Sequence, residues 1–254
     1  MATVPAARQT LQILAYLSRQ AGPVPAASLM RDLDLPRSTA YHLLGTLIDL
    51  GFVTHLPEER RYALGVAAYE LGSGYSRQAP LARIARVPLA ALADRTGHSA
   101  HLAVPHGREV LYVLEERAPG RAPLVTDVGV RLPAQLTASG RAILAALPPA
   151  QLRALFPEPS AFVLRTGRGP RSMSALRALL VDARRVGHAS EDGEITVGQA
   201  SVAAAVLDHS GHPVAGVAVT FPTTTTSAAE RDRIATRVVR AAALLSRRIG
   251  GTVA

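Results

Sequence analysis

Apolar residues recur at helical spacing through the first fifty positions of the chain. A helix over 5–20 is expected from an apolar face made of Leu11, Leu14, Ala15, Leu17 and Ser18. A short helix over 26–33 follows, and a third helix begins at Pro36, where a missing N–H group costs nothing. The inward face of that third helix comprises Ala40, Leu43, Leu44, Leu47 and Ile48. Gly51 suits the position just after it.

A hairpin and a connecting helix are expected next. Residues 52–56 and 61–64 flank a turn-forming Pro-Glu-Glu-Arg sequence, which is typical of two paired strands. Residues 65–76 begin with helix-compatible residues and end with glycines, which predicts a connecting helix that stops at a hinge. The N-terminal domain is therefore expected to run helix, helix, helix, hairpin.

Helix and strand patterns mix in the rest of the chain. The expected helices cover 81–96, 139–147, 149–156 and 173–186, and the expected strands cover 99–104, 109–117, 124–126, 201–207 and 214–220. Thr226 or Ser227 caps a final helix. One side of that helix is formed by Ile234, Val238, Ala241, Leu245 and Ile249. This order predicts an α+β domain with a mixed or antiparallel sheet and flanking helices.

Composition excludes several classes of protein. Hydrophobic residues make up 48% of the 254 residues, too many for a chain that is mainly disordered. The chain has no cysteine, which excludes disulfides, thiolate metal sites and a catalytic thiol. No apolar run reaches the roughly 18–20 residues of a membrane helix, and the N-terminus lacks a signal-peptide pattern. We therefore expect a soluble, cytoplasmic protein.

The net charge of +9 rests entirely on arginine, because all 28 basic residues are Arg. Guanidinium groups bind planar anions well, so nucleic acid is a partner to consider. Residues 1–76 nevertheless carry six Arg and six acidic residues, so the whole surplus lies in residues 77–254. Motifs, rather than bulk charge, must therefore identify the partner.

The strongest chemical pattern consists of two short helices separated by a Leu-Asp-Leu-Pro turn and followed by a hairpin. A helix that enters the DNA major groove presents short polar and basic side chains from its N-terminal half. The third helix and the hairpin offer such side chains at Arg37, Ser38, Thr39, Tyr41, His42, Arg60 and Arg61. These groups can bind phosphates, sugars and base edges. The alternative is that Ser38 only caps the helix and that the arginines form a solvated face.

The N-terminal domain resembles the winged helix-turn-helix of the IclR family of bacterial transcription regulators in "LQILAYLSRQAGPVPAASLMRDLDLPRSTAYHLLGTLIDLGFV" and in "RYALG". The rest resembles that family's C-terminal effector-binding domain in "HLAV", "RLPAQLTASGRAILA" and "SVAAAVLDHSGHPVAGVAVTFP". The resemblance covers residues 8–249. It departs from the family pattern at His42, where many relatives carry a basic residue, at Ser201, where cysteine is common, and at Phe221, where a small residue is usual.

This resemblance implies a winged helix-turn-helix over 1–65, a linker helix and hinge over 66–80, and a GAF-like effector-binding and oligomerisation domain over 81–254 with a mostly antiparallel sheet. It implies a DNA-binding regulator, expected to be a repressor, that forms a homodimer or a dimer of dimers and needs no cofactor. Its operator affinity would change when a small carboxylate-bearing metabolite binds. The metabolite pocket would be lined by Leu124, Ala138, Ser139, Glu191, Ser201, Ala218 and Thr220.

The residues themselves partly support that pocket. Ser139 begins a helix whose free N–H groups can receive a carboxylate. Ser201 and Thr220 lie on strands that can aim hydroxyl groups into a cavity. Arg141 follows Ser139, and the sequence leaves open whether it points outward or toward the pocket. An equally good interpretation makes Ser139 a helix cap and assigns plain core positions to Leu124, Ala138 and Ala218.

The acidic and histidine clusters do not predict a metal site. The Glu-Asp-Gly-Glu cluster at 191–194 lacks the alternating ligands of a calcium loop, so a solvated turn is expected, in which Glu191 can still bind a ligand's hydroxyl or amide. The pairs His98 with His101 and His209 with His212 lack a third zinc ligand, and surface positions are expected for them.

Two other functions stay open. A metabolite-converting enzyme would use the C-terminal domain, although the sequence holds no nucleophile elbow, P-loop or dinucleotide fingerprint. A non-specific nucleic-acid-binding protein would use the arginine-rich second part of the chain, and it should bind mixed-sequence DNA as well as any promoter.

Overall fold

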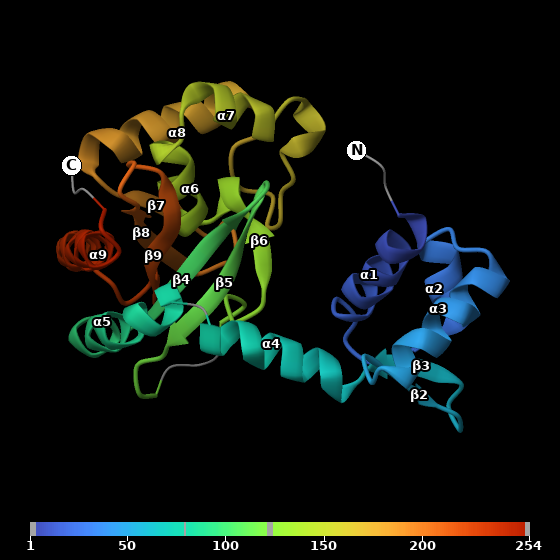
Figure 1. The fold of residues 1–254 in the computed structure, drawn as a ribbon. Coiled ribbons are helices and arrows are strands. Elements are labelled where there is room, and N and C mark those ends of the chain that lie inside the picture. Colours follow the sequence, from blue (N-terminus) through green and yellow to red (C-terminus); the bar gives the residue numbers. More distant parts are fainter. Residues whose placement is uncertain (1–3, 79, 121–123, 252–254) are drawn as a thin grey trace. The chain divides into compact units, whose positions relative to one another are not determined.

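In the computed structural model, which describes residues 4–78, 80–120 and 124–251, the chain forms two units, Met1–Ala79 (unit 1) and Pro80–Ala254 (unit 2). Unit 1 begins with helices α1 (Pro5–Leu17), α2 (Ala26–Asp32) and α3 (Arg37–Asp49). Its strands are β1 (Val24–Pro25), β2 (Val53–Leu56) and β3 (Arg61–Leu64), which form an antiparallel sheet in the order β1-β3-β2 (Figure 1). The predicted order of three helices and a hairpin is confirmed.

The core of unit 1 is formed mainly by its three helices. Ile13, Leu29 and Leu44 are fully or almost fully buried there. The inward face predicted for α1 is wrong at three of its five positions, because Leu11, Ala15 and Ser18 are exposed, and Ile13 takes a core position beside Leu17. Six of the seven residues 11–17 are hydrophobic, so spacing alone leaves two possible inward stripes and tertiary packing selects one. Ile48 of α3 is likewise 37% exposed instead of inward.

The connecting helix is longer than predicted. Helix α4 (Val66–Gln78) continues through the segment 72–74, where glycines were expected to end it at a hinge. A glycine inside a helix costs only about 1 kcal/mol relative to alanine, which neighbouring helix-forming residues can offset. The glycines therefore do not end this helix, contrary to prediction, and the helix runs to Gln78.

Unit 2 is built on a six-stranded antiparallel sheet in the order β6-β5-β4-β9-β8-β7. Its strands are β4 (Ser99–His106), β5 (Glu109–Glu116), β6 (Arg131–Pro133), β7 (Ala189–Asp192), β8 (Gln199–Leu207) and β9 (Pro213–Pro222). Its helices are α5 (Pro80–Thr96), α6 (Ala138–Ala146), α7 (Pro149–Leu155), α8 (Met173–Val186) and α9 (Ala228–Arg248), with short 3-10 turns at Ala134–Leu136 and Pro159–Ala161. Among the described residues, no helix has the length and apolarity that crossing a membrane requires.

Side chains of the sheet alternate between two helical layers. Val202 and Val217 face α5 and α9, whereas Ala203 and Ala218 face α6 and α8 (Figure 1). This is the period-two pattern of a sheet covered on both faces. Ser201 and Thr220 have the same parity as Ala203 and Ala218, so their hydroxyl groups lie on the α6 side.

Two strand predictions are wrong. Residues 124–126 form a loop, and the edge strand β6 follows at 131–133 instead. Strand β7 lies where a solvated turn was expected, and it pairs with β8 so that Glu191 stands opposite Ser201. The acidic composition of 191–194 hid this strand, because acidic residues are depleted in strands and only the pairing with β8 makes it one.

The first turn of α6 lies unusually close to its neighbours. A Cβ atom on Gly140 would lie 2.2 Å from the backbone oxygen of Ala134 and 2.4 Å from its Cα. A Cβ atom on Gly216 of β9 would lie 2.8 Å from the backbone oxygen of Ser139. These two glycines allow α6 to begin directly against the sheet.

We expect Gly140→Ala to lower the free energy of unfolding of unit 2 by at least about 2 kcal/mol, because the added methyl group meets backbone atoms that cannot move aside. Thermal and urea unfolding measure the effect. The control is Gly72→Ala, since no atom lies within 4 Å of a Cβ there and alanine favours the helix. Equal stability of Gly140→Ala and the wild type would contradict the close packing of α6.

Candidate functional site

Helix α3 presents a polar face opposite its buried one. Arg37, Ser38, Tyr41 and His42 are exposed, Thr39 is half-buried, and the inward side is formed by Ala40, Leu44 and Leu47. The guanidinium carbon of Arg37 lies 5.8 Å from the centroid of the Tyr41 ring, a cation–π contact that holds the two side chains together. The five residues that the sequence assigns to DNA therefore share the solvent side of one helix.

The helix cap of α3 does not use Ser38. Pro36 occupies the N-cap position, and no side chain forms a hydrogen bond to the first turn. The alternative interpretation of Ser38 as a capping residue is therefore wrong. Its hydroxyl is exposed near the free N–H groups of a helix N-terminus, a combination that suits a phosphate oxygen.

The two hairpin arginines differ in their surroundings. Arg60 lies in the β2–β3 turn with φ of 53°, and it is exposed. Arg61 is also exposed, but its Nη1 donates a hydrogen bond to the backbone oxygen of Pro23 at 3.0 Å. Arg61 therefore also ties the hairpin to the chain before β1.

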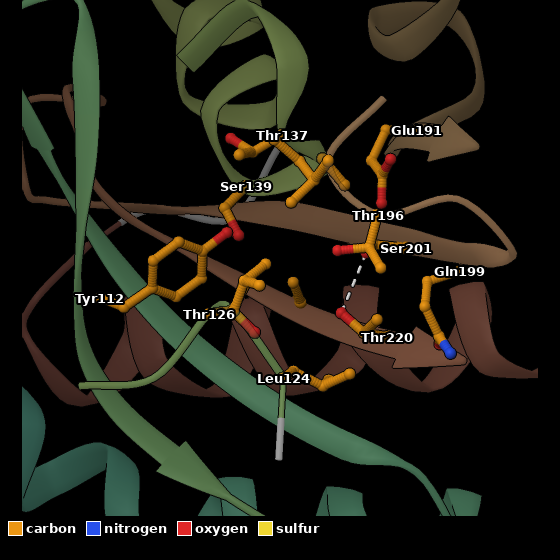
Figure 2. A pocket seen from close by; sticks show the side chains of 14 residues that line it. Tyr112, Leu124, Thr126, Thr137, Ser139, Glu191, Thr196, Gln199, Ser201 and Thr220 are labelled. Carbon is orange, nitrogen blue, oxygen red and sulfur yellow. Dashed lines mark hydrogen bonds between the residues drawn. The ribbon is translucent and has the colours of Figure 1, made fainter. Parts of the chain in front are cut away.

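A buried pocket lies on the α6 face of the sheet in unit 2 (Figure 2). All seven residues that the sequence assigns to an effector pocket line it together. The others in its lining, which sequence reasoning missed, are Tyr112, Val125, Thr126, Thr137, Ile195, Thr196 and Gln199. The pocket thus brings together strands, loops and one helix start that are far apart in the sequence.

The wall formed by α6 carries a hydroxyl group that the helix itself does not use. Thr137 is the N-cap residue, and its Oγ1 accepts a hydrogen bond from the Gly140 N–H at 2.9 Å. Ser139 is therefore not the cap, and its buried Oγ has no hydrogen bond of good geometry among the described residues. The Tyr112 hydroxyl lies beside it (Figure 2), and burial raises the pKa of Tyr112 so that this group stays protonated.

The opposite wall carries a chain of hydrogen bonds. The Ser201 hydroxyl donates to Oε1 of Glu191 at 2.8 Å and lies 2.9 Å from the Thr220 hydroxyl. Burial raises the pKa of Glu191 to about 7, although the hydrogen bond from Ser201 opposes this shift. The pocket therefore holds a carboxyl group that changes charge near neutral pH.

Arg141, whose direction the sequence left open, lies inside the protein. Its Nε donates to the Gln135 oxygen at 2.8 Å, its Nη1 to the Ser190 oxygen at 2.6 Å, and its Nη2 to Glu194 at 2.8 Å. Burial alone would raise the pKa of Glu194, but Arg141 and backbone N–H groups outweigh burial and lower it. The backbone N–H of Glu194 in turn donates to Glu191 at 3.2 Å.

His98 and His101 are buried, so the surface positions expected for this pair are wrong; His209 and His212 are exposed as predicted. The Nε2 of His101 lies 3.4 Å from the Thr126 hydroxyl, and its ring meets the Tyr112 ring edge-on at 5.8 Å between centroids. Burial lowers the pKa of His101 to about 4, so it is neutral under physiological conditions. His101 thus contacts two residues that line the pocket, Thr126 and Tyr112.

The pocket is nearly closed, and its described lining residues include no basic side chain. Its free volume is about 20 Å³, room for about one water molecule. Loop residues Leu124 and Val125 form part of its lining and are only partly covered, with Val125 39% exposed. A larger ligand therefore requires this loop or the lining side chains to move.

Some of the missed lining residues had a signal in the sequence. Thr137 stands three residues before Gly140, at the spacing of an N-cap side chain and its N–H partner, and that spacing identifies it as a cap. No such signal existed for Tyr112. The β4–β5 pairing shifts register at Leu102/Ala103, so strand alternation in the sequence does not tell which face of the sheet Tyr112 occupies.

Comparison with known proteins agrees with this architecture. A family model described as "IclR helix-turn-helix domain" matches residues 6–57, and one described as "Bacterial transcriptional regulator IclR C-terminal" matches residues 73–247. The HTH-type transcriptional regulator XynR of Escherichia coli is 29% identical over 250 residues, covering 98% of this chain and 99% of XynR. The Pca regulon regulatory protein of Pseudomonas putida is 31% identical over 194 residues, covering 76% of this chain and 66% of the relative.

Solved structures share the fold. An IclR transcriptional regulator from Alicyclobacillus acidocaldarius has a TM-score of 0.86 at 24% identity and covers 98% of this chain and 100% of its own. An IclR homologue from Microbacterium hydrocarbonoxydans, complexed with 4-hydroxybenzoate, has a TM-score of 0.79 at 20% identity and covers 96% and 98%. The family and the named relatives are transcriptional regulators, which excludes the enzyme alternative. Because the two family models together match most of its length, the chain belongs to the IclR family of bacterial transcriptional regulators.

Proposed function

We propose that this regulator is a repressor whose affinity for its operator is controlled by a small carboxylate-bearing metabolite bound in the pocket of unit 2. The observation that carries the proposal is the pairing of two unlike polar walls around one buried space. One wall is the start of α6 with Ser139, and the other is the hydrogen-bonded chain of Glu191, Ser201 and Thr220. In a bacterial cell such a protein would work in the cytoplasm, where its operator lies.

The two walls suit a ligand with two kinds of polar group. The first-turn N–H groups of α6 and the Ser139 hydroxyl favour a carboxylate, because a helix N-terminus carries partial positive charge. The wall of Glu191 disfavours a second anion and accepts a hydroxyl or amide donor instead. The effector class is therefore a small acid that also carries a hydrogen-bond donor, and 4-hydroxybenzoate, the ligand of one structural relative, is one such acid.

Regulation requires the ligand to distinguish two states of the protein. A metabolite changes operator affinity only if it binds more tightly to the DNA-free or to the DNA-bound arrangement. Because the pocket is nearly closed, the entering ligand must displace its lining, including the loop of Leu124 and Val125. Helix α4 is the chain segment that connects this change to the DNA-binding unit.

The protein is proposed to act as a homodimer or a dimer of dimers. Each unit 1 supplies one recognition helix, so paired operator half-sites require two chains. Helix α4 carries exposed apolar side chains at Val66, Tyr69 and Leu71, which are 68%, 75% and 66% exposed. Burying such side chains against a second copy would be favourable.

We expect Arg37→Ala to reduce selective binding to the operator beside the protein's own gene by about 5- to 150-fold, because one guanidinium contact to a base is worth about 1–3 kcal/mol. Fluorescence anisotropy at fixed salt, with operator and mixed-sequence duplexes, measures the selectivity. Arg19→Ala is the matched control, since Arg19 is exposed in the same unit but lies outside α3. Intact selectivity in a folded Arg37→Ala protein would contradict the assignment of α3 as the recognition helix. A wild type that binds both duplexes equally would instead support non-specific binding.

We expect Ser139→Leu to remove the response to the effector while operator binding is kept, because the larger side chain fills the carboxylate position. The effector is first identified as the small carboxylate that raises the melting temperature most in a screen that includes 4-hydroxybenzoate. Ser139→Ala, which removes only the hydroxyl, should weaken ligand binding several-fold, and Ser160→Leu at an exposed position is the control. If Ser139→Leu still releases DNA at the wild-type ligand concentration, the effector binds elsewhere.

We expect the unfolding free energy of the wild type, relative to Glu191→Gln, to fall as pH rises from 5 to 7 and then to level off. The unfolded chain ionises at the ordinary pKa of 4.5, whereas the folded protein keeps the proton up to about 7. The folded state therefore loses up to about 3 kcal/mol across this window. Urea unfolding at pH 5, 6, 7 and 8 tests this, with the exposed Glu158→Gln as control. Parallel pH profiles of the wild type and Glu191→Gln would show that Glu191 is not held protonated.

A further inference from the structure

Helices α5 and α9 form an open groove on the face of the sheet that lies opposite the effector pocket. The groove has a free volume of about 520 Å³. Its apolar part consists of Pro88, Ala91 and Leu92 from α5 and Ala241 and Leu244 from α9. Val87 at its edge is 71% exposed, so the apolar surface continues onto the outside of the protein. Among the described residues of unit 2, none closes the groove from outside.

Four arginines, and no acidic residue, complete the lining: Arg95, Arg237, Arg240 and Arg248. None of the four forms an ion pair with a described acidic residue, although six other arginines do so, among them Arg86 and Arg231. From residue 233 to its end, α9 carries five arginines and no acidic residue. Part of the arginine surplus therefore lies in this groove, and no described acidic residue forms an ion pair with these four side chains.

Two of these arginines also hold the helices together. Arg237 donates a hydrogen bond to the backbone oxygen of Arg95, and Arg248 donates to that of Ile84 at 3.4 Å. Within α5 the Ile84 carbonyl receives no hydrogen bond from residue 88, because Pro88 has no N–H group. A guanidinium has five N–H donors, so both side chains retain donors for an anion. No hydrogen bond to a described residue is made by the Arg240 or Arg95 side chain in the structure.

The dimensions and charge of the groove argue against three kinds of occupant: an enclosed small molecule, duplex DNA and a second copy of the chain. Arg237 and Arg248 are eleven residues apart on α9, which places them about 16 Å apart along three helical turns. An enclosed small-molecule site covers most of its ligand, whereas this groove is open on one side. Duplex DNA offers phosphates but no apolar ridge for the five apolar residues. A second copy related by a two-fold axis would bring two copies of this basic surface together, which repulsion between like charges disfavours.

We propose that the α5–α9 groove binds an acidic amphipathic helix of another protein, with the apolar stripe of that helix on the groove and its carboxylates against the four arginines. A helix of about three turns fits the length, and apolar residues at i, i+3, i+4 and i+7 fit the helix-in-groove mode. Carboxylates on both sides of the stripe would form charge-assisted hydrogen bonds with arginine. The groove belongs to unit 2 and shares no lining residue with the effector pocket, whereas the DNA-binding helix belongs to unit 1.

The test uses the full chain and a fluorescein-labelled peptide of about 14 residues with leucine at those four positions and glutamate at most others. We expect saturable binding by fluorescence anisotropy. Affinity should fall at least fivefold for the double variant Arg95→Ala/Arg240→Ala and for Val87→Glu, which places a negative charge at the exposed edge. Arg233→Ala, an exposed position on the same helix outside the groove, should leave the affinity within twofold. Circular dichroism confirms that the variants fold.

Four outcomes would overturn the proposal. The first is no binding of the peptide, and the second is equal binding of a scrambled peptide with the same composition. The third is that a mixed-sequence DNA duplex binds more tightly than the peptide and is the ligand lost in Arg95→Ala/Arg240→Ala. That third result would assign the groove to nucleic acid. A peptide affinity that Arg233→Ala reduces as much as the double variant would likewise show only general attraction to a basic surface.

Discussion

The buried guanidinium of Arg141 is the interaction on which the effector pocket depends. It joins the start of α6 to strand β7 and to Glu194, and Glu194 in turn places Glu191 through its backbone N–H. Removing one partner of a buried ion pair leaves an unpaired charge, which costs about 3–5 kcal/mol. The two glycines at 140 and 216 let this helix lie against the sheet. Together they fix the distance between the two walls of the pocket.

Much of the fold was predictable because its elements have local causes. The period-two pattern of β8 and β9 and the glycine that ends α8 act within a few residues, and these elements agree with prediction. Strand β7 was not predictable, because its acidic residues are stabilised by β8 and Arg141, which are distant in the sequence. The predicted end of α4 was wrong for the opposite reason, because the glycines at 72–74 destabilise a helix too weakly to stop it among helix-forming neighbours.

The candidate sites were likewise predictable only in part. The exposed polar face of α3 follows from helical spacing alone, and the residues proposed to bind DNA were named from the sequence. The seven pocket residues came from family resemblance, and the structure places them around one cavity. The roles of Tyr112, His101 and Arg141 depend on burial, which no local pattern indicates. The charge surplus also gains a location, since part of it lines the α5–α9 groove, while the domain that reads DNA is formally neutral.

Control of DNA binding by a ligand in the pocket of unit 2 is the central claim, and it has a thermodynamic signature. Isothermal titration of the identified carboxylate into the free protein, and into the protein saturated with operator, gives two dissociation constants. Linkage requires their ratio to equal the factor by which the ligand changes operator affinity. We predict weaker ligand binding to the operator complex by that factor, which is typically 5–150-fold. Equal dissociation constants for the free protein and the complex would contradict the account.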